Sequence, residues 1–451
     1  MIELDVDEQA ILDLFVDLLP PERWAELEGE LEGRRRPQLY SLRVVAAMMI
    51  LQQLEARGTQ GEVVQKLAAG RLDHLLPNSK RARNKTISAN PGAYCTACQE
   101  FPLELLQKAC DLMLAELSKR MGSEAGEAPV RILLVDGTSF SLEHEEELLQ
   151  HYPPARNQNG SAHWGIMRVV VLHDLYTGIA WYPQWGPMYG AQAVGEQELA
   201  ERALAKVPPG AVVMGDANFG IFSFAYQATQ RQHPVLFRLT AQRARAMGAN
   251  GLLPRGEQEF CWKPTRKDRE ATPSLPGEAQ IPGRLLAVQV PGFRQPLFLF
   301  TTLTVPLEQV VKTYSLRWNI ELDLRSLKHT LDLFHLRGKS KDAVEKQVLV
   351  AMVAYGLVRM FMAAAARRAG IEPRQLSFTA ACGLLNLMVD KLCWGSREQR
   401  AQELDRLLRL MLTRKLPQRA RKRQFDRTVW GFRASFPFRR LDGTPSKSKW
   451  H

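Results

Sequence analysis

The fold is decided by the stretch RILLVDG, residues 131–137, in which four aliphatic residues are followed by Asp136 and a glycine. A short apolar run bounded in this way predicts a buried strand that ends at Asp136-Gly137. The stretch AVVMGD, residues 211–216, repeats the pattern and ends on Asp216. Either aspartate alone is more often a turn residue or a helix cap than a site residue. Two of them at strand ends of one sheet favour a shared site.

The segments around these two strands predict a mixed α/β layer. Apolar runs and helical periodicity place the other elements along the chain. The expected elements are strands at 166–172, 178–185 and 234–239 and helices at 195–206 and 222–230. Residues 241–305 are rich in Pro, Gly and Arg and contain three short apolar runs, which indicate a small β-rich insertion.

Helices are expected on both sides of this α/β region. Before it, helical periodicity appears at 41–56, 60–76 and 103–119. After it, a long helix from about 307 to 334 is followed by further helices to about 412. The apolar segment 348–366 carries an arginine near its centre, which favours a buried core helix over a membrane span.

The formal net charge of +12 is concentrated at one end of the chain. Residues 411–451 carry 12 Lys and Arg against 2 Asp and Glu, so the rest is nearly neutral. Six aromatic residues interleave with these cations, which favours an arm that binds nucleic acid over a solvated tail. The six cysteines are too few for a disulfide scaffold, and the acidic N-terminus lacks signal-peptide features, so a cytoplasmic protein is expected.

The long helix presents a polar stripe. Tyr314, Arg317, Glu321 and Lys328 project within roughly 60° of one another, with Arg325 close by. An ordinary solvated face with an Arg317–Glu321 ion pair is the simpler interpretation of this spacing alone.

The two strand-end aspartates change that weighting, because with Glu321 they give three carboxylates on three separate elements. Such a cluster needs a compensating cation. Its hard oxygen ligands favour Mg²⁺ or Mn²⁺. Two such ions support phosphodiester displacement.

These residues resemble the Y-R-E-K signature of the bacterial DDE transposases of the insertion-sequence four family. The signature is carried by Tyr314-x2-Arg317-x3-Glu321-x6-Lys328. VDGT at 135–138 is similar to the strand that carries the family's first aspartate, and MGDANF at 214–219 is similar to the strand that carries its second. The chain departs from the family pattern where an arginine often follows the second aspartate and here Ala217 stands.

The resemblance implies an α/β fold with a ribonuclease H-like catalytic core, a β-rich insertion, and flanking helical regions. Asp136, Asp216 and Glu321 would hold two Mg²⁺ ions, with Mn²⁺ able to substitute. Tyr314, Arg317 and Lys328, with Arg325 beside them, would contact the transposon-end DNA. The expected regions are a helical N-terminal DNA-binding region (1–120), the first part of the core (130–240), the insertion (241–305), the helix completing the core (306–345), a helical C-terminal region (346–412) and a basic aromatic-rich arm (413–451).

The reaction implied by the resemblance is Mg²⁺-dependent cleavage at terminal inverted repeats of double-stranded DNA, followed by strand transfer into target DNA. A homodimer on paired ends is expected, with no membrane partner. A DDE nuclease that cuts without strand transfer uses the same residues and stays an alternative. A catalytically inactive DNA-binding regulator of the same fold is a second alternative, disfavoured by the intact carboxylates.

Three other features of the sequence bear on function. The cluster of Lys80, Arg81 and Arg83 has no acidic neighbours, which modestly favours contact with DNA phosphates. The Cys95-x2-Cys98 pair resembles half a zinc site, but without a second pair a structural role is favoured. His163 and Trp164 are read as the entry to a strand in preference to a site.

Overall fold

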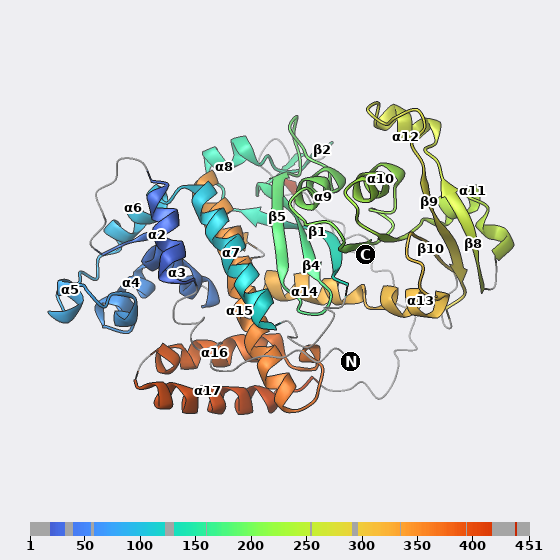
Figure 1. Cartoon of the computed structure of the whole chain (residues 1–451). Helices are drawn as coiled ribbons and strands as arrows, with labels where there is room; N and C mark the ends of the chain where they lie inside the picture. The colour runs from blue at the N-terminus through green and yellow to red at the C-terminus, as the bar shows by residue number, and fades with distance from the viewer. Residues whose placement is uncertain are drawn as a thin grey trace, which may run out of the picture.

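The computed structural model describes residues 19–31, 39–55, 58–121, 130–158, 160–252, 255–290, 296–333, 335–393, 395–416 and 438–439. Its centre is one large mixed sheet, in the strand order β5-β4-β1-β6-β7-β10-β9-β8, with β11 added to β1 (Figure 1). The strands are β1 Ile132–Leu142, β4 Ile166–Asp174, β5 Ala180–Pro187, β6 Val212–Gly215, β7 Val235–Arg238, β8 Arg255–Trp262, β9 Ile281–Val288, β10 Leu297–Thr301 and β11 His335–Leu336.

The sheet changes direction at β1. The strands β5, β4 and β1 are antiparallel, whereas β6 runs parallel to β1 and β7 runs parallel to β6. The three apolar runs of 241–305 form β8, β9 and β10, and β10 pairs with β7. The β-rich insertion therefore continues the main sheet instead of forming a separate one.

β1 is longer than the sequence predicts. The expectation that it ends at Asp136-Gly137 is wrong, because the strand continues to Leu142. Beyond Asp136 it stays paired with β4 as far as Ser141, which lies opposite Ile166. Ser141 and Leu142 also pair with β11. Asp136 thus lies in the middle of a strand, just past the last residue paired with β6.

Helices pack against both the sheet and one another. α9 (Glu196–Leu204) contacts β1, β4 and β5, and α10 (Phe222–Gln230) contacts β7 and β9. Below the sheet in the view of Figure 1 run α13 (Leu307–Ser315) and α14 (Trp318–His329). They replace the single helix expected over 307–334: around Leu316 and Arg317 the backbone bonds span three residues instead of four, which tightens the turn.

The N-terminal region is helical where it is described. Its helices are α2 Pro21–Gly29, α3 Leu42–Leu54, α4 Gln60–Ala68, α5 Lys80–Arg83, α6 Gly92–Glu100 and α7 Leu103–Met121. The helix expected over 60–76 ends at Ala68, because Gly70 takes a positive φ of 79° and only a short 3₁₀ turn, Asp73–Leu75, follows.

α15 (Lys341–Arg368) is the central helix of the molecule. It packs against α3, α7, β5 and α17 (Arg397–Leu412), while α16 (Phe378–Cys393) packs on both α15 and α17. It is long and apolar enough to cross a membrane, yet its most apolar window is entirely buried inside the protein. It is therefore the buried core helix that Arg359 predicts.

Most of the basic arm lies outside the described residues. The described parts are residues 413–416, where Lys415 pairs with Leu376, and β12 (Phe438–Arg439), which pairs with β3 (Gly160–Ala162). Together with β2 (Arg156–Asn157) these strands form a small separate sheet.

Candidate active site

Asp136 and Asp216 are brought side by side by the register of two parallel strands. Val135 pairs with Gly215, so each aspartate follows one member of this pair. A backbone N–H holds each carboxylate: Gly137 donates to Asp136 Oδ1 at 2.8 Å, and Asn218 donates to Asp216 Oδ1 at 2.8 Å. The two strands thus fix both carboxylates at one edge of the parallel part of the sheet.

The site around Asp136 is electrostatically strained. The pKa of Asp136 is raised to about 6, and burial is the largest cause. The charges of Asp216 and Glu196 act in the same direction, whereas the Gly137 N–H and Arg317 oppose the rise. Desolvation and like charges both disfavour a carboxylate anion. An added cation would relieve this repulsion.

The polar stripe of α13 and α14 lies next to the two aspartates. Arg317 Nη2 donates to Glu321 Oε1 at 3.0 Å, and the guanidinium is also attracted by the Asp216 carboxylate. The Tyr314 side chain is buried with its hydroxyl facing Arg317, and burial raises the pKa of Tyr314 to about 12. The Arg317–Glu321 ion pair that an ordinary solvated helix face would show is therefore present. It is partly buried, however, and its arginine adjoins the Asp216 carboxylate.

Lys328 closes the arrangement from the other end of α14. Burial lowers the pKa of its ammonium group, while attraction to Asp136 acts in the opposite direction. Arg325, in contrast, is exposed on α14, and no described contact joins it to the aspartates. The structure thus gathers Tyr314, Arg317 and Lys328 at the site and leaves Arg325 at its margin.

Carboxylates are the donor set of this site, and they fit a hard divalent cation such as Mg²⁺. In the described part of the chain, no three His, Cys, Asp or Glu side chains are close enough together to hold a metal ion. Glu321 is bonded to Arg317 and does not join Asp136 and Asp216 around one point. Shared metal binding by the three carboxylates stays a prediction.

Comparison with known proteins decides the family. The transposase DDE domain family matches residues 128–357, which contain both aspartates, the insertion and the whole stripe. The chain belongs to the DDE transposases, in the insertion-sequence four family. It is similar to the transposase InsG for insertion sequence element IS4 of Escherichia coli (strain K12), with 26% identity over 373 residues, 80% of this chain and 79% of that protein.

One residue at the site of this DDE transposase, Glu196, is not indicated by the sequence. Glu196, in the first turn of α9, accepts a hydrogen bond from the side chain of Asn218, whose backbone holds Asp216. A Cβ on Gly137 would lie 2.8 Å from the Glu196 carboxyl group. Glycine at this position therefore leaves room for the Glu196 side chain beside Asp136. In the sequence, a glutamate at a helix start is indistinguishable from an ordinary N-terminal acidic residue.

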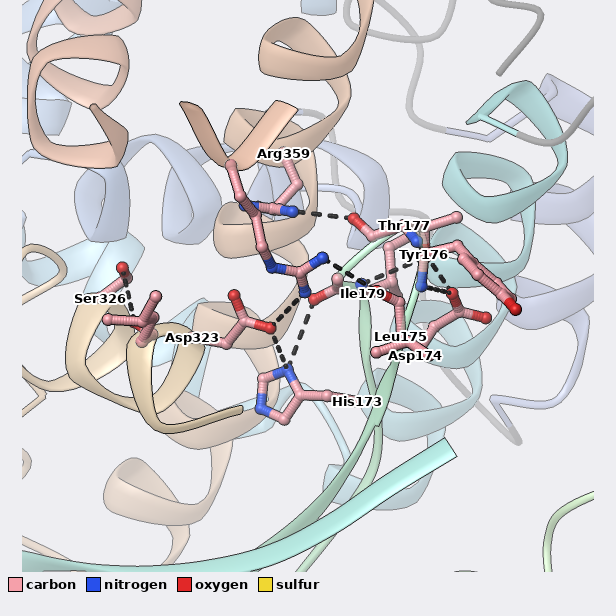
Figure 2. A network of polar contacts seen from close by, with 12 residues as sticks. His173, Asp174, Leu175, Tyr176, Thr177, Ile179, Asp323, Ser326 and Arg359 are labelled. Carbon is pink, nitrogen blue, oxygen red and sulfur yellow. Dashed lines mark hydrogen bonds and ion pairs between the residues drawn. The ribbon is translucent and has the colours of Figure 1, made fainter. Parts of the chain in front are cut away.

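Asp323 lies on the other side of α14 from the site, as its projection predicts. It is 3% exposed, and Arg374 Nη2 bonds its Oδ2 at 2.7 Å. Figure 2 shows it pointing toward His173, whose Nδ1 is 3.9 Å from the same oxygen. Burial alone would raise the pKa of Asp323, but the charges of Arg374 and Arg359 outweigh it and hold the pKa below its usual value.

The remaining candidates lie away from this edge. Lys80, Arg81 and Arg83 are exposed on α5, which Figure 1 places at the far side of the helical region from the sheet. The thiol of Cys95 donates to Gln60, and burial raises the pKa of Cys98 to about 12. A thiol with so high a pKa is a poor metal ligand.

His163 and Trp164 precede β4, as the sequence predicts. The imidazole of His163 stacks on that of His144 with ring centroids 4.1 Å apart. Trp164 packs edge-on against His335 of β11.

Proposed function

We propose that this transposase cleaves DNA at the ends of an insertion sequence and joins them to target DNA in Mg²⁺-dependent steps. The adjacency of Asp136 and Asp216 across two parallel strands, with Arg317 and Lys328 beside them, carries the proposal. Carboxylates that bind cations, flanked by residues that bind phosphate, suit in-line displacement at phosphorus.

Each site residue has a proposed role. Asp136, Asp216 and Glu321 would hold the metal, two Mg²⁺ ions or Mn²⁺ in their place. When bound, such ions activate water and stabilise the attacking and leaving oxygens. Tyr314, Arg317 and Lys328 would contact the phosphates of the DNA end, with Arg325 at the margin.

The regional plan is also part of the proposal. Three antiparallel strands followed by two parallel ones, with Asp136 on the central strand, support a ribonuclease H-like core at 130–240 that is completed by 306–345. The insertion would be 241–305, and the flanking regions 1–120, 346–412 and 413–451. In the first of these, Lys80, Arg81 and Arg83 would bind DNA outside the active site.

We further propose a cytoplasmic protein that acts as a homodimer on paired ends. Coupling two cleavage events requires two sites on one synaptic complex.

The test is cleavage of a duplex carrying the terminal inverted repeat that flanks the reading frame, with and without Mg²⁺. Wild type should cut, and Asp136→Ala, Asp216→Ala and Glu321→Ala should not. Glu278→Ala, an exposed carboxylate in the insertion, is the matched control and should cut normally. Cleavage by Glu321→Ala would refute the site.

The nuclease alternative is separated by its product. A pre-cut end with a free 3′-hydroxyl should be joined to a target plasmid by wild type and not by Asp216→Ala. Cutting without any joined product would favour the nuclease, and no cutting by wild type would favour the inactive regulator.

A further inference from the structure

The helix that carries Glu321 is anchored on its opposite face by an ion pair between a buried aspartate and a partly buried arginine. Glu321 is half-buried at the site, whereas Asp323 is 3% exposed and packed toward the interior. Its partner Arg374 comes from a short 3₁₀ helix, Pro373–Gln375, that follows α15. The two side chains meet at 2.7 Å between Nη2 and Oδ2.

Arg374 joins three parts of the fold. Besides Asp323 of α14, its Nη1 donates to the carbonyl of Leu175 at 2.9 Å, in the turn between β4 and β5. In the same turn, Thr177 accepts a hydrogen bond from Arg359 of α15 at 3.4 Å, as Figure 2 shows. The turn, the central helix and the Glu321 helix are therefore linked by the guanidinium groups of Arg374 and Arg359.

A buried carboxylate of this kind tolerates little displacement. Its desolvation is compensated only while its partner stays in hydrogen-bond contact, and loss of the partner leaves an unpaired buried charge. Sliding or rotation of α14 would separate Asp323 from Arg374 and from His173 together. The network thus favours one position of the helix.

We infer that Asp323 and Arg374 are positioning residues that hold α14 in the position where Lys328 adjoins Asp136 and Glu321 lies on the site side of the helix. This inference rests on the proposed role of Glu321. Arg374 lies beyond residues 128–357, the part matched by the DDE domain family. The C-terminal helical region thereby takes part in forming the active site.

The test compares three variants. Arg374→Met removes the charge and keeps most of the side-chain length, Arg374→Lys restores a charge, and Asp323→Asn keeps the shape of the acid. Arg368→Met is the matched control, because Arg368 makes an ion pair of the same 2.7 Å length with Asp405 of α17, remote from α14. For each variant we would measure kcat and KM for end DNA, and amide hydrogen exchange in residues 318–329.

Arg374→Met and Asp323→Asn should lower kcat on the order of 10- to 100-fold, as expected for a small misplacement of a catalytic group. Their KM should stay unchanged and exchange in 318–329 should accelerate. Arg374→Lys should recover part of kcat, whereas Arg368→Met should match wild type in every readout.

Wild-type kcat and wild-type exchange in Arg374→Met would overturn the inference. An equal loss in Arg374→Lys and Arg374→Met, with unchanged exchange, would also overturn it. The exchange measurement needs no DNA, so it tests the anchoring of α14 separately from cleavage. If Arg374→Met is poorly folded, Asp323→Asn provides the second variant for the same measurement. If Glu321→Ala still cuts, the proposed function fails instead, independently of these results.

Discussion

Asp216 lies beside Asp136 because Gly215 of β6 pairs in parallel with Val135 of β1. The backbone register sets the spacing of the two aspartates. Substitutions of surrounding side chains will therefore change the charge of the site and the orientation of the carboxylates more readily than the distance between the two strands.

Glu196→Ala should slow end cleavage by about 10- to 100-fold, the loss typical for residues that orient metal ligands. Glu196 is the partner of the Asn218 side chain, and the Asn218 backbone N–H holds Asp216. Glu198→Ala on the same helix is exposed and should cleave normally. Equal rates for the two variants in a cleavage time course would contradict this role.

Lys328→Met should weaken binding of end DNA and lower the slope of log affinity against log salt by about 1, as for one lost phosphate contact. Its ammonium group is half-buried and adjoins Asp136. The comparison is Lys312→Met, because Lys312 is exposed on α13. Fluorescence anisotropy at several salt concentrations measures both slopes, and identical slopes for the two variants would argue against a phosphate contact at Lys328.

Replacing Lys80, Arg81 and Arg83 together by alanine should lower the salt slope by about 2 to 3 and leave the cleavage rate of the bound complex unchanged. The reason is that α5 is remote from the sheet (Figure 1). A charge-matched triple variant of Arg397, Arg406 and Arg409 on α17 is the control. A drop in single-turnover rate with saturating protein would show that α5 acts on the active site after all.

Gly220→Ala should lower the free energy of unfolding by about 1–3 kcal/mol, the usual cost of overpacking. A Cβ at Gly220 would overlap the carbonyl oxygen of Arg238, at the end of β7. Gly277→Ala, where a Cβ meets no atom within 4 Å, should be neutral. Urea unfolding of both variants checks the difference, and equal midpoints would exclude the clash.

Asp111→Asn should stabilise the protein at neutral pH. Burial raises the pKa of Asp111 from 3.8 to about 6, although Lys206 opposes the shift. A carboxyl whose pKa rises on folding destabilises the fold once ionised: the cost is absent below about pH 4, grows to about pH 6, and stays constant above.

The gain at about pH 7.5 should be about 1–2 kcal/mol and should shrink toward pH 4.5. Thermal unfolding at both pH values measures it. Glu104→Gln, an exposed acid on the same helix, should show no such trend, and a pH-independent gain for Asp111→Asn would mean that ionisation is not its cause.

The local sequence predicts most of the elements, and it fails where pairing partners decide. RILLVDG indicates a strand, but its continuation to Leu142 depends on β4 and β11, which lie far away in the sequence. Likewise, periodicity predicts one helix over 307–334 and misses the tightened turn at Leu316. The end of α4 at Ala68, in contrast, follows from Gly70 and was open to prediction.

The candidate site shows the same division. Asp136, Asp216 and the Y-R-E-K stripe are found from strand ends, helical spacing and resemblance. Glu196 and Arg374 are not found in this way, because each resembles an ordinary surface charge in the sequence. Only the fold brings Glu196 to Asn218 and Arg374 to Asp323. Asp323 is correctly removed from the stripe, but its partner cannot be read from helical spacing.

The central helix α15 has a consequence for the synthesis of the protein. A nascent chain that ends before Lys341 already contains Asp136, Asp216 and Glu321, yet it lacks the helix on which α3, α7 and β5 pack. Domains fold as units while the chain is synthesised from its N-terminus. The region that carries the carboxylates therefore cannot complete its packing until α15 has been synthesised. Premature termination before Lys341 would therefore yield a product that holds every signature residue but lacks the helix against which α3, α7 and β5 pack.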